Sequence, residues 1–321
     1  MNLTEPESSA ERPAHPLHGI HAATLCPMDD NGHILEEVLA THVNRVAVTS
    51  GLQGLLVNGH AGEGGLLTSN ERINVLDTIK ASVPVECHIC AGVAGESTAV
   101  AIQSAVDAAE HGADSILVFP PNAWALGHDT AMVKKHHQAI AEACELPMVL
   151  YRAPLAAGKQ SYSINTLQSL LDIDAVTAIK EGSWEVSAYE EAYHAVIAIR
   201  PDVAVLGSGD EHLMTCYAIG SAGSQVSLAA IVPSLIVSLF DSMQANDLST
   251  ARRLHALIYP LSNAIYRRSP SYKATARLKT CLKILEQFPT DSVKGPLLRS
   301  DASEYSALET LLGGSEYARY L

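Results

Sequence analysis

Lys180 is the side chain with the clearest chemical potential in this sequence. It follows the apolar run Ala175–Ile179, so it closes an expected strand. Partial desolvation at such a position disfavours the ammonium ion and lowers the lysine pKa, which leaves a free amine that can attack a carbonyl. A lysine that pairs with Glu181 or extends to water is the alternative, and the residue type alone does not decide between the two.

Tyr151 closes the strand expected just before that of Lys180. A phenol beside an imine can transfer protons as a general acid and base. A tyrosine that bonds only to a backbone group is the alternative, because its apolar ring and polar tip suit any strand end that meets water.

The turn Gly59–Glu63 follows another expected strand end. Its exposed backbone N–H groups, around Gly59, His60 and Ala61, can hold a carboxylate. His60 can add a charge or a proton, although a loop histidine bonded to a nearby carbonyl fits equally well. For Glu63 we favour a salt bridge that braces the turn.

These groups require a fold that gathers strand ends, and the sequence indicates one. The eight expected strands are Gly19–Leu25, Gly54–Asn58, Val85–Ala91, Ser115–Phe119, Met148–Tyr151, Ala175–Lys180, Val203–Leu206 and Gln225–Leu228. Segments with helical spacing separate them, among them Glu36–Thr49, Asn70–Ala81, Val100–His111, Thr130–Cys144 and Val186–Ile199. This alternation predicts a (β/α)₈ barrel, whose reactive groups gather at the carboxyl ends of the strands. An open doubly wound sheet is disfavoured, because residues 26–30 are not a glycine-rich phosphate loop.

The chain divides into three expected parts: a flexible N-terminal tail (1–17), the barrel (18–243) and a C-terminal helical region (244–321). The last part shows only helical spacing, at Ser249–Arg268, Ser271–Glu286 and Ser303–Leu312. The uncharged stretch Leu213–Phe240 contains glycines and a proline, so we expect a helix, a short strand and another helix there instead of a membrane span.

Composition excludes several classes of partner. The formal net charge is −14 and the 21 lysines and arginines are scattered, which disfavours nucleic acid. No signal peptide is recognisable, so we expect a cytoplasmic protein without a membrane partner. Cys87 and Cys90 form a CxxC pattern inside an apolar run, where we expect buried thiols. We expect no metal site and no cofactor.

Five short motifs occur in order at the expected strand ends: Cys26–Asp29, the Gly59–Glu63 turn, Tyr151-x-x-Pro154, Ile179–Glu181 and Ser208–Asp210. With them the chain resembles the dihydrodipicolinate synthase / N-acetylneuraminate lyase family from about Gly19 to Asp241. The resemblance implies a barrel with C-terminal helices, usually a homotetramer. It implies that Lys180 forms an imine with pyruvate or another 2-oxo acid, and that Tyr151 transfers the proton.

The chain also departs from that family's pattern. His60 and Ala61 stand where the family has two hydroxyl residues, Asn122 stands at the position of a second tyrosine, and Ala156 at that of a substrate-binding arginine. Arg152 cannot replace that arginine, because adjacent strand residues face opposite ways. Dihydrodipicolinate synthesis is therefore disfavoured.

The leading hypothesis is a Schiff-base lyase, either an aldolase or a dehydratase, that acts on a 2-oxo acid. Lys180 and Tyr151 are the expected catalytic residues. Gly59, His60, Ala61, Asn122 and Gly209 are the expected substrate-binding residues. A synthase with a rebuilt proton relay and a non-catalytic keto-acid-binding relative are the alternatives. We expect a homo-oligomer, either a tetramer or a dimer.

Overall fold

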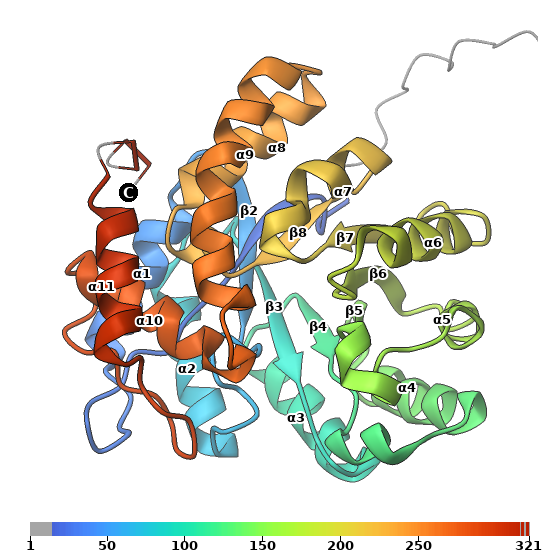
Figure 1. Ribbon diagram of the computed structural model, residues 1–321. Helices are drawn as coiled ribbons and strands as arrows, with labels where there is room; N and C mark the ends of the chain where they lie inside the picture. Colours follow the sequence, from blue (N-terminus) through green and yellow to red (C-terminus); the bar gives the residue numbers. More distant parts are fainter. Residues whose placement is uncertain (1–14, 315, 318, 321) are drawn as a thin grey trace, which may run out of the picture.

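The computed structural model describes residues 15–314, 316–317 and 319–320. Eight parallel strands close into a barrel in chain order, and helices surround it (Figure 1). The predicted (β/α)₈ barrel is confirmed. The strands are β1 (Gly19–Ala23), β2 (Leu52–Val57), β3 (His88–Val93), β4 (Ser115–Val118), β5 (Met148–Arg152), β6 (Val176–Glu181), β7 (Ala204–Gly207) and β8 (Gly223–Val226).

Strand register decides which side chains enter the barrel. Tyr151 on β5 pairs with Lys180 on β6, and the next pair along the same strands is Arg152 with Glu181. Because neighbouring strand residues face opposite ways, the first pair points inward and the second points to the helix layer. The Arg152 guanidinium and the Glu181 carboxylate form a buried ion pair of 3.0 Å there, as expected for an arginine that faces away from Tyr151.

The outer layer consists of helices that begin with recognisable caps. In α2, Thr68 and Glu71 form a reciprocal capping box, and the Asp129 side chain caps the first turn of α4. The barrel helices are α1 (Glu36–Ala47), α2 (Ser69–Ser82), α3 (Thr98–Glu110), α4 (Thr130–Cys144), α5 (Ile164–Leu170), α6 (Val186–Ile197), α7 (Leu213–Ile219) and α8 (Pro233–Gln244).

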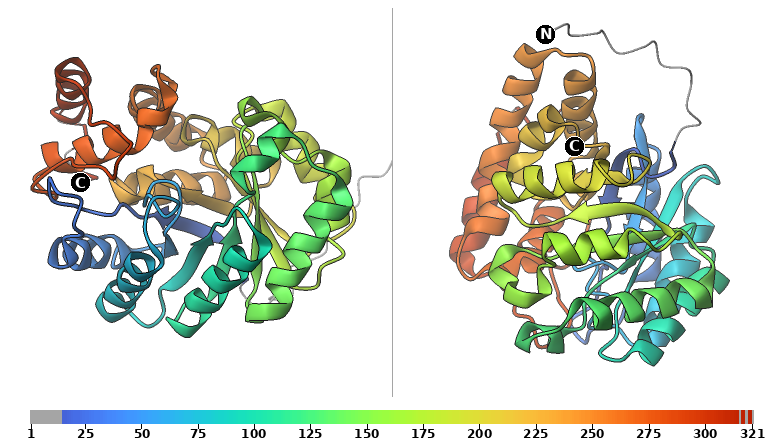
Figure 2. Two further views of the ribbon diagram at one scale, coloured as in Figure 1. Left: turned by 90° about the horizontal axis from the view of Figure 1, so that it is seen from below. Right: turned by 90° about the vertical axis from the view of Figure 1, so that its right-hand side faces the viewer.

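Three more α-helices follow the barrel: α9 (Leu248–Ser262), α10 (Ala274–Ile284) and α11 (Ala302–Leu312). They lie together on one side of the barrel, beside α1 and α8 (Figures 1 and 2). Phe288, just after α10, packs edge-on against His42 of α1, with ring centroids 5.1 Å apart. The C-terminal region is therefore part of the packed body of the molecule.

Five strands start elsewhere than predicted: β6 and β7 by one residue, β2 and β8 by two, and β3 by three. β3 begins at His88 and not at Val85, because a turn with a hydrogen bond from Cys87 N–H to Pro84 O leaves Val85 exposed. β8 begins at Gly223, where close pairing with β1 requires glycine, since a Cβ atom would lie 1.9 Å from the Gly19 carbonyl oxygen. The apolar content of the sequence indicates neither the turn before β3 nor the close pairing of β8 with β1.

The uncharged stretch Leu213–Phe240 contains α7, β8 and most of α8, which confirms the predicted helix, strand and helix. None of the helices among the described residues is long and apolar enough to cross a membrane. Cys87 and Cys90 are buried free thiols, as predicted. Of the expected tail, residues 1–14 lie outside the described part, and Leu17 is fully buried.

Candidate active site

The carboxyl ends of the strands surround a cavity of about 510 Å³. Four of the residues predicted from the sequence line it: Lys180, Tyr151, His60 and Ala61. The remainder of the wall contains apolar residues, several hydroxyl groups and the charged residues Glu185, Asp210 and Arg267. It also contains Ala156, the position at which the sequence lacks an arginine. The cavity is therefore the place where the predicted chemistry can occur.

Lys180 is the one lysine among the described residues that line this cavity. Its strand passes through the barrel core, and burial lowers the lysine pKa to about 8, while the nearby Asp210 carboxyl opposes that shift. A substantial fraction of neutral amine is then present near pH 7–8, as nucleophilic attack on a carbonyl requires. The alternative pairing with Glu181 does not occur, because that carboxylate faces the helix layer and binds Arg152.

Tyr151 lies beside Lys180 in an aromatic group. Its ring meets Phe119 and His60 edge-on, with centroids 4.9 Å and 5.4 Å away. Burial, reinforced by the Glu181 charge, raises the pKa of the Tyr151 phenol well above its usual value. The phenol is thus protonated at rest and suited to donate a proton or a hydrogen bond to a developing negative charge.

His60 faces the same cavity and is open to water through its mouth. Its ring packs on Phe119 at 4.3 Å between centroids. Desolvation by the surrounding wall, together with the Lys180 charge, holds the pKa of His60 below its ordinary value. The ring is therefore neutral at pH 7 and offers a ligand a hydrogen bond or a packing surface instead of a positive charge.

The turn that carries His60 has a strained but well-supported backbone. Asn58 and Glu63 adopt left-handed conformations, and a Cβ atom on Gly64 would lie 1.9 Å from the Asn58 carbonyl oxygen. Bonds from Glu63 N–H to His60 O and from Gly64 N–H to Gly59 O close the turn. Glu63 and Gly64 are the donors of both bonds, and none of the hydrogen bonds among the described residues uses the N–H group of His60 or of Ala61.

Glu63 braces this turn, as predicted. Its carboxylate forms an ion pair with Lys279 of α10, and neither side chain has any exposed area. A second carboxylate oxygen accepts the Lys294 backbone N–H at 2.7 Å. The Thr275 hydroxyl also donates to the His60 carbonyl at 3.4 Å. The C-terminal region thus holds the turn from outside the barrel.

Asp210, absent from the predicted site residues, is the second buried ionisable group near Lys180. It accepts the Leu228 N–H at 3.0 Å, and the Tyr266 hydroxyl lies 3.5 Å away. Burial raises the Asp210 pKa to about 7, while the Leu228 N–H and the Lys180 charge oppose the rise. Its place in the Ser208–Asp210 motif was the available signal in the sequence.

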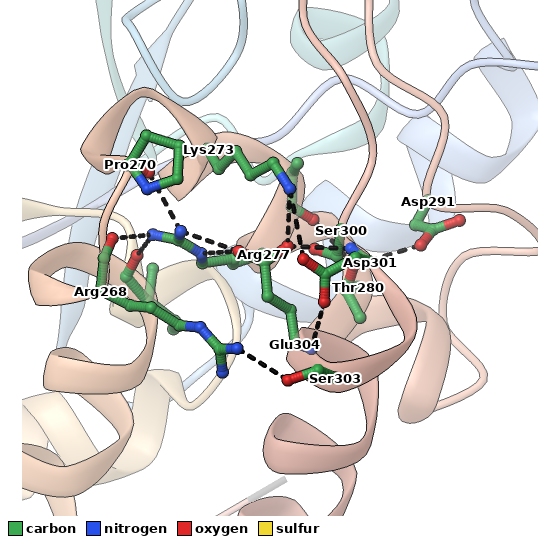
Figure 3. Close-up of polar contacts among 12 residues, drawn as sticks. Arg268, Pro270, Lys273, Arg277, Thr280, Asp291, Ser300, Asp301, Ser303 and Glu304 are labelled. Atoms are coloured by element: carbon green, nitrogen blue, oxygen red, sulfur yellow. Dashed lines mark hydrogen bonds and ion pairs between the residues drawn. The ribbon is translucent and has the colours of Figure 1, made fainter.

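The outer wall of the cavity comes from the C-terminal region, which sequence reasoning missed. A fully buried arginine, Arg277, donates to the carbonyls of Ile265, Arg268 and Pro270 at 2.7–3.0 Å and to the Glu304 carboxylate at 2.8 Å (Figure 3). This network fixes the segment after α9. That segment and the start of α10 supply the wall residues Tyr266, Arg267, Ser271, Tyr272 and Thr275.

Three predicted substrate-binding residues do not line the cavity. Gly59 packs against Leu56, and Gly209 lies between the lining residues Ser208 and Asp210 with a φ of 128° that favours glycine. Asn122 is exposed, and its backbone N–H donates to Glu96 at 2.9 Å. Direct substrate binding by these three residues stays a prediction.

Comparison with known proteins supports one family. The model of the Dihydrodipicolinate synthetase family matches residues 16–314. A 4-hydroxy-tetrahydrodipicolinate synthase from Geobacter sulfurreducens is 30% identical over 268 residues, which cover 83% of this chain and 88% of that protein. An uncharacterized DapA-like lyase from Halobacterium salinarum is 29% identical over 293 residues, covering 91% and 92%.

Solved structures agree on the fold. Dihydrodipicolinate synthase from Thermotoga maritima superimposes with a TM-score of 0.86 at 20% identity and covers 94% of this chain and all of that one. A prophage protein of the dihydrodipicolinic acid synthase family from E. coli K12, solved in complex with pyruvate, gives a TM-score of 0.85 at 21% identity. It covers 92% of this chain and 98% of that one.

Proposed function

Because the chain belongs to the Dihydrodipicolinate synthetase family, we propose that it is a Schiff-base-forming lyase, an aldolase or a dehydratase, that acts on a 2-oxo acid. One observation carries this proposal: Lys180 lies in the barrel cavity with a lowered pKa, directly across the strand pair from Tyr151. A buried amine next to a buried phenol is the pair of groups that imine chemistry needs.

The reaction follows from these groups. The neutral Lys180 amine adds to the C2 carbonyl, the carbinolamine loses water, and a protonated imine results. This imine accepts the electron pair of a bond at the adjacent carbon C3, so that a proton or an aldehyde leaves and an enamine forms. In a dehydratase the enamine pair then expels the hydroxyl group of C4, which takes up a proton and leaves as water. Tyr151 supplies or removes the proton that each of these steps requires. Hydrolysis of the imine then releases the product and restores Lys180.

The Gly59–Ala61 turn is the proposed site for the substrate carboxylate. Its available N–H groups and the neutral His60 ring offer hydrogen bonds without a positive charge, while protonated Lys180 or the imine supplies the charge nearby. Asn122 and Gly209 are proposed to shape the access to this site. No metal or organic cofactor takes part in the proposed steps.

A dihydrodipicolinate synthase with a rebuilt relay is the less favoured candidate. Ala156 lines the cavity at the position of the family's arginine, and Arg152 is held outside the barrel by Glu181 and by backbone carbonyls. A bidentate arginine–carboxylate contact is among the stronger polar contacts, so its loss weakens binding of a second carboxylate. We expect little or no product from pyruvate and aspartate semialdehyde in a coupled assay. A specific activity typical of a biosynthetic enzyme would contradict this expectation.

Borohydride trapping tests the proposal. The protein is incubated with sodium borohydride and a panel of 2-oxo acids that includes pyruvate, and intact mass is measured. We expect one adduct per chain in the wild type and in Lys159→Ala, which removes an exposed lysine outside the cavity, and none in Lys180→Ala. An adduct that persists in Lys180→Ala, or no adduct with any acid, would refute imine formation at Lys180. Calorimetric binding without an adduct would identify a non-catalytic keto-acid binder.

We also propose a homo-oligomer, a tetramer or a dimer, in the cytoplasm. The resemblance to the family is its support. Light scattering after size-exclusion chromatography gives the mass, and a monomer at micromolar concentration would contradict it.

A further inference from the structure

Gln225 is a buried amide at the floor of the cavity, and the proposed steps do not use it. It lies on β8, has no exposed area, and lines the cavity together with Lys180 and His60. Neither its Nε2 nor its Oε1 has a nitrogen or oxygen hydrogen-bond partner among the described residues. Leaving a buried polar group unpaired costs about 1–3 kcal/mol, which an apolar residue at the same place would not incur.

Strand geometry directs this amide into the barrel. The preceding residue, Ser224, accepts the Tyr217 hydroxyl of α7 at 3.0 Å and therefore faces the helix layer. Because side chains alternate along a strand, Gln225 faces inward. The thiol of Cys90 lies beside it, close also to Lys180.

Among the described residues the Cys90 thiol is the polar neighbour within reach of the amide, and a thiol is only a weak donor and a weak acceptor. His21, its register partner on β1, is equally buried, but both ring nitrogens of His21 are themselves unpaired. The remaining neighbours on the cavity floor, Ala23, Leu56 and Val226, are apolar. The donor and the acceptor of Gln225 therefore lack a strong partner in the scaffold.

We propose that Gln225 contacts the substrate and selects a 2-oxo acid that carries a hydroxyl group. This inference rests on the proposed function, since it places the substrate at Lys180. A carboxamide has a donor and an acceptor, and a hydroxyl group satisfies both. A carboxylate would satisfy only the donor and would meet the lone pairs of Oε1. The hydroxyl groups of Ser183, Ser208 and Ser227, which line the same cavity, suit a polar substrate as well.

Pairs of ligands that differ only by a hydroxyl group in place of a methyl group test the selection. The pairs are 3-hydroxypyruvate with 2-oxobutanoate, and 4-hydroxy-2-oxobutanoate with 2-oxopentanoate. Dissociation constants are measured by calorimetry, which reads binding with or without an imine. We expect the wild type to prefer the hydroxylated member of at least one pair by about fivefold, the effect of one net hydrogen bond.

The variants are Gln225→Met and Gln225→Leu, which replace the amide with an apolar side chain of similar size. Both should lose the preference and bind the methyl compounds as the wild type does. The control is Thr177→Val on β6. It removes a buried, unpaired hydroxyl group that does not line the cavity, so this variant should retain the preference. Circular dichroism confirms the fold of each variant.

Equal binding within both pairs in the wild type, or a preference that survives in both Gln225 variants, overturns the assignment. The borohydride experiment separates this result from a failure of the proposed function. An adduct at Lys180 with an unchanged preference in the variants retains the lyase and removes Gln225 from substrate selection. A preference that depends on Gln225 without any adduct retains Gln225 as a contact of the ligand and removes imine formation at Lys180.

Discussion

The ion pair between Glu63 and Lys279 should control how strongly the C-terminal region supports the active-site turn. Neither side chain is exposed, and the Lys279 ammonium also donates to the Ser292 carbonyl at 2.8 Å. Lys279→Met leaves the Glu63 carboxylate buried and without its cation. Removing one partner of a buried pair costs about 3–5 kcal/mol, a large part of the roughly 5–15 kcal/mol by which a folded protein is stable.

Urea denaturation at pH 7, followed by circular dichroism, measures this loss. The matched control is Lys283→Met on the same helix, whose 3.1 Å ion pair with Asp291 leaves 36% of the lysine side chain exposed. Asp291 is buried, but in this variant it keeps the Thr280 hydroxyl at 3.1 Å and the Arg299 guanidinium at 3.9 Å, so Lys283→Met should lose clearly less stability than Lys279→Met. The double variant Glu63→Gln, Lys279→Met carries no buried charge at this place and should recover part of the stability that Lys279→Met loses.

The same variant tests whether the pair positions the turn. Because Glu63 and His60 belong to one turn, Lys279→Met should weaken keto-acid binding, while Lys180 is still trapped by borohydride at saturating ligand. Lys283→Met should change neither. The reasoning is refuted if Lys279→Met loses less than about 1 kcal/mol, or if it loses stability but keeps the wild-type dissociation constant.

Four further predictions concern the cavity itself. Tyr151→Phe should lower turnover about 10²–10⁴-fold while the borohydride adduct still forms, and unchanged turnover would assign the proton to another group. His60→Ala should raise the keto-acid dissociation constant roughly tenfold. The ratio of the variant's dissociation constant to that of the wild type should be the same from pH 6 to 8, since the His60 ring is already neutral there. Calorimetry checks both, and unaltered binding would leave His60 a purely structural role. The initial trapping rate should rise with pH and level off above about 8, the pKa of Lys180. Below that pH the charged lysine destabilises the folded state. Lys180→Met should therefore raise the free energy of unfolding, measured with urea, by about 1–3 kcal/mol at pH 7. This difference from the wild type should vanish as pH rises towards 10.5. A stability gain that is independent of pH would contradict this assignment of the charge.

The chemistry of the cavity depends on opposite effects of one environment. Burial lowers the pKa of Lys180 and raises that of Tyr151, so that the amine is readily neutral and the phenol stays protonated. Each group is thereby in the state from which the proposed reaction starts. The Arg152–Glu181 pair, on the outer face of the same two strands, keeps its own charges away from the cavity.

Local pattern in the sequence determined the barrel and its two central residues. Alternating strand and helix segments are short-range features, and the carboxyl ends of parallel strands must meet at one end of a barrel. Lys180 and Tyr151 close two consecutive strands, so their meeting follows from topology alone. The outward direction of Arg152 also followed from the period of two along a strand. The bracing role of Glu63 was predicted, but not its partner.

Only the tertiary structure decided the remainder, because it depends on contacts between residues far apart in the chain. Lys279, the partner of Glu63, comes from a helix beyond the barrel, and Arg277 fixes a cavity wall that helical spacing could not reveal. Gln225 reads as an ordinary strand residue until barrel closure brings β8 beside β1 and places its amide under the cavity. Asn122 is the opposite case. It follows a strand end, as the predicted site residues do, but it is exposed and does not line the cavity. Periodicity specifies which face of an element is buried, whereas closure of the barrel and docking of the C-terminal helices specify what that face meets.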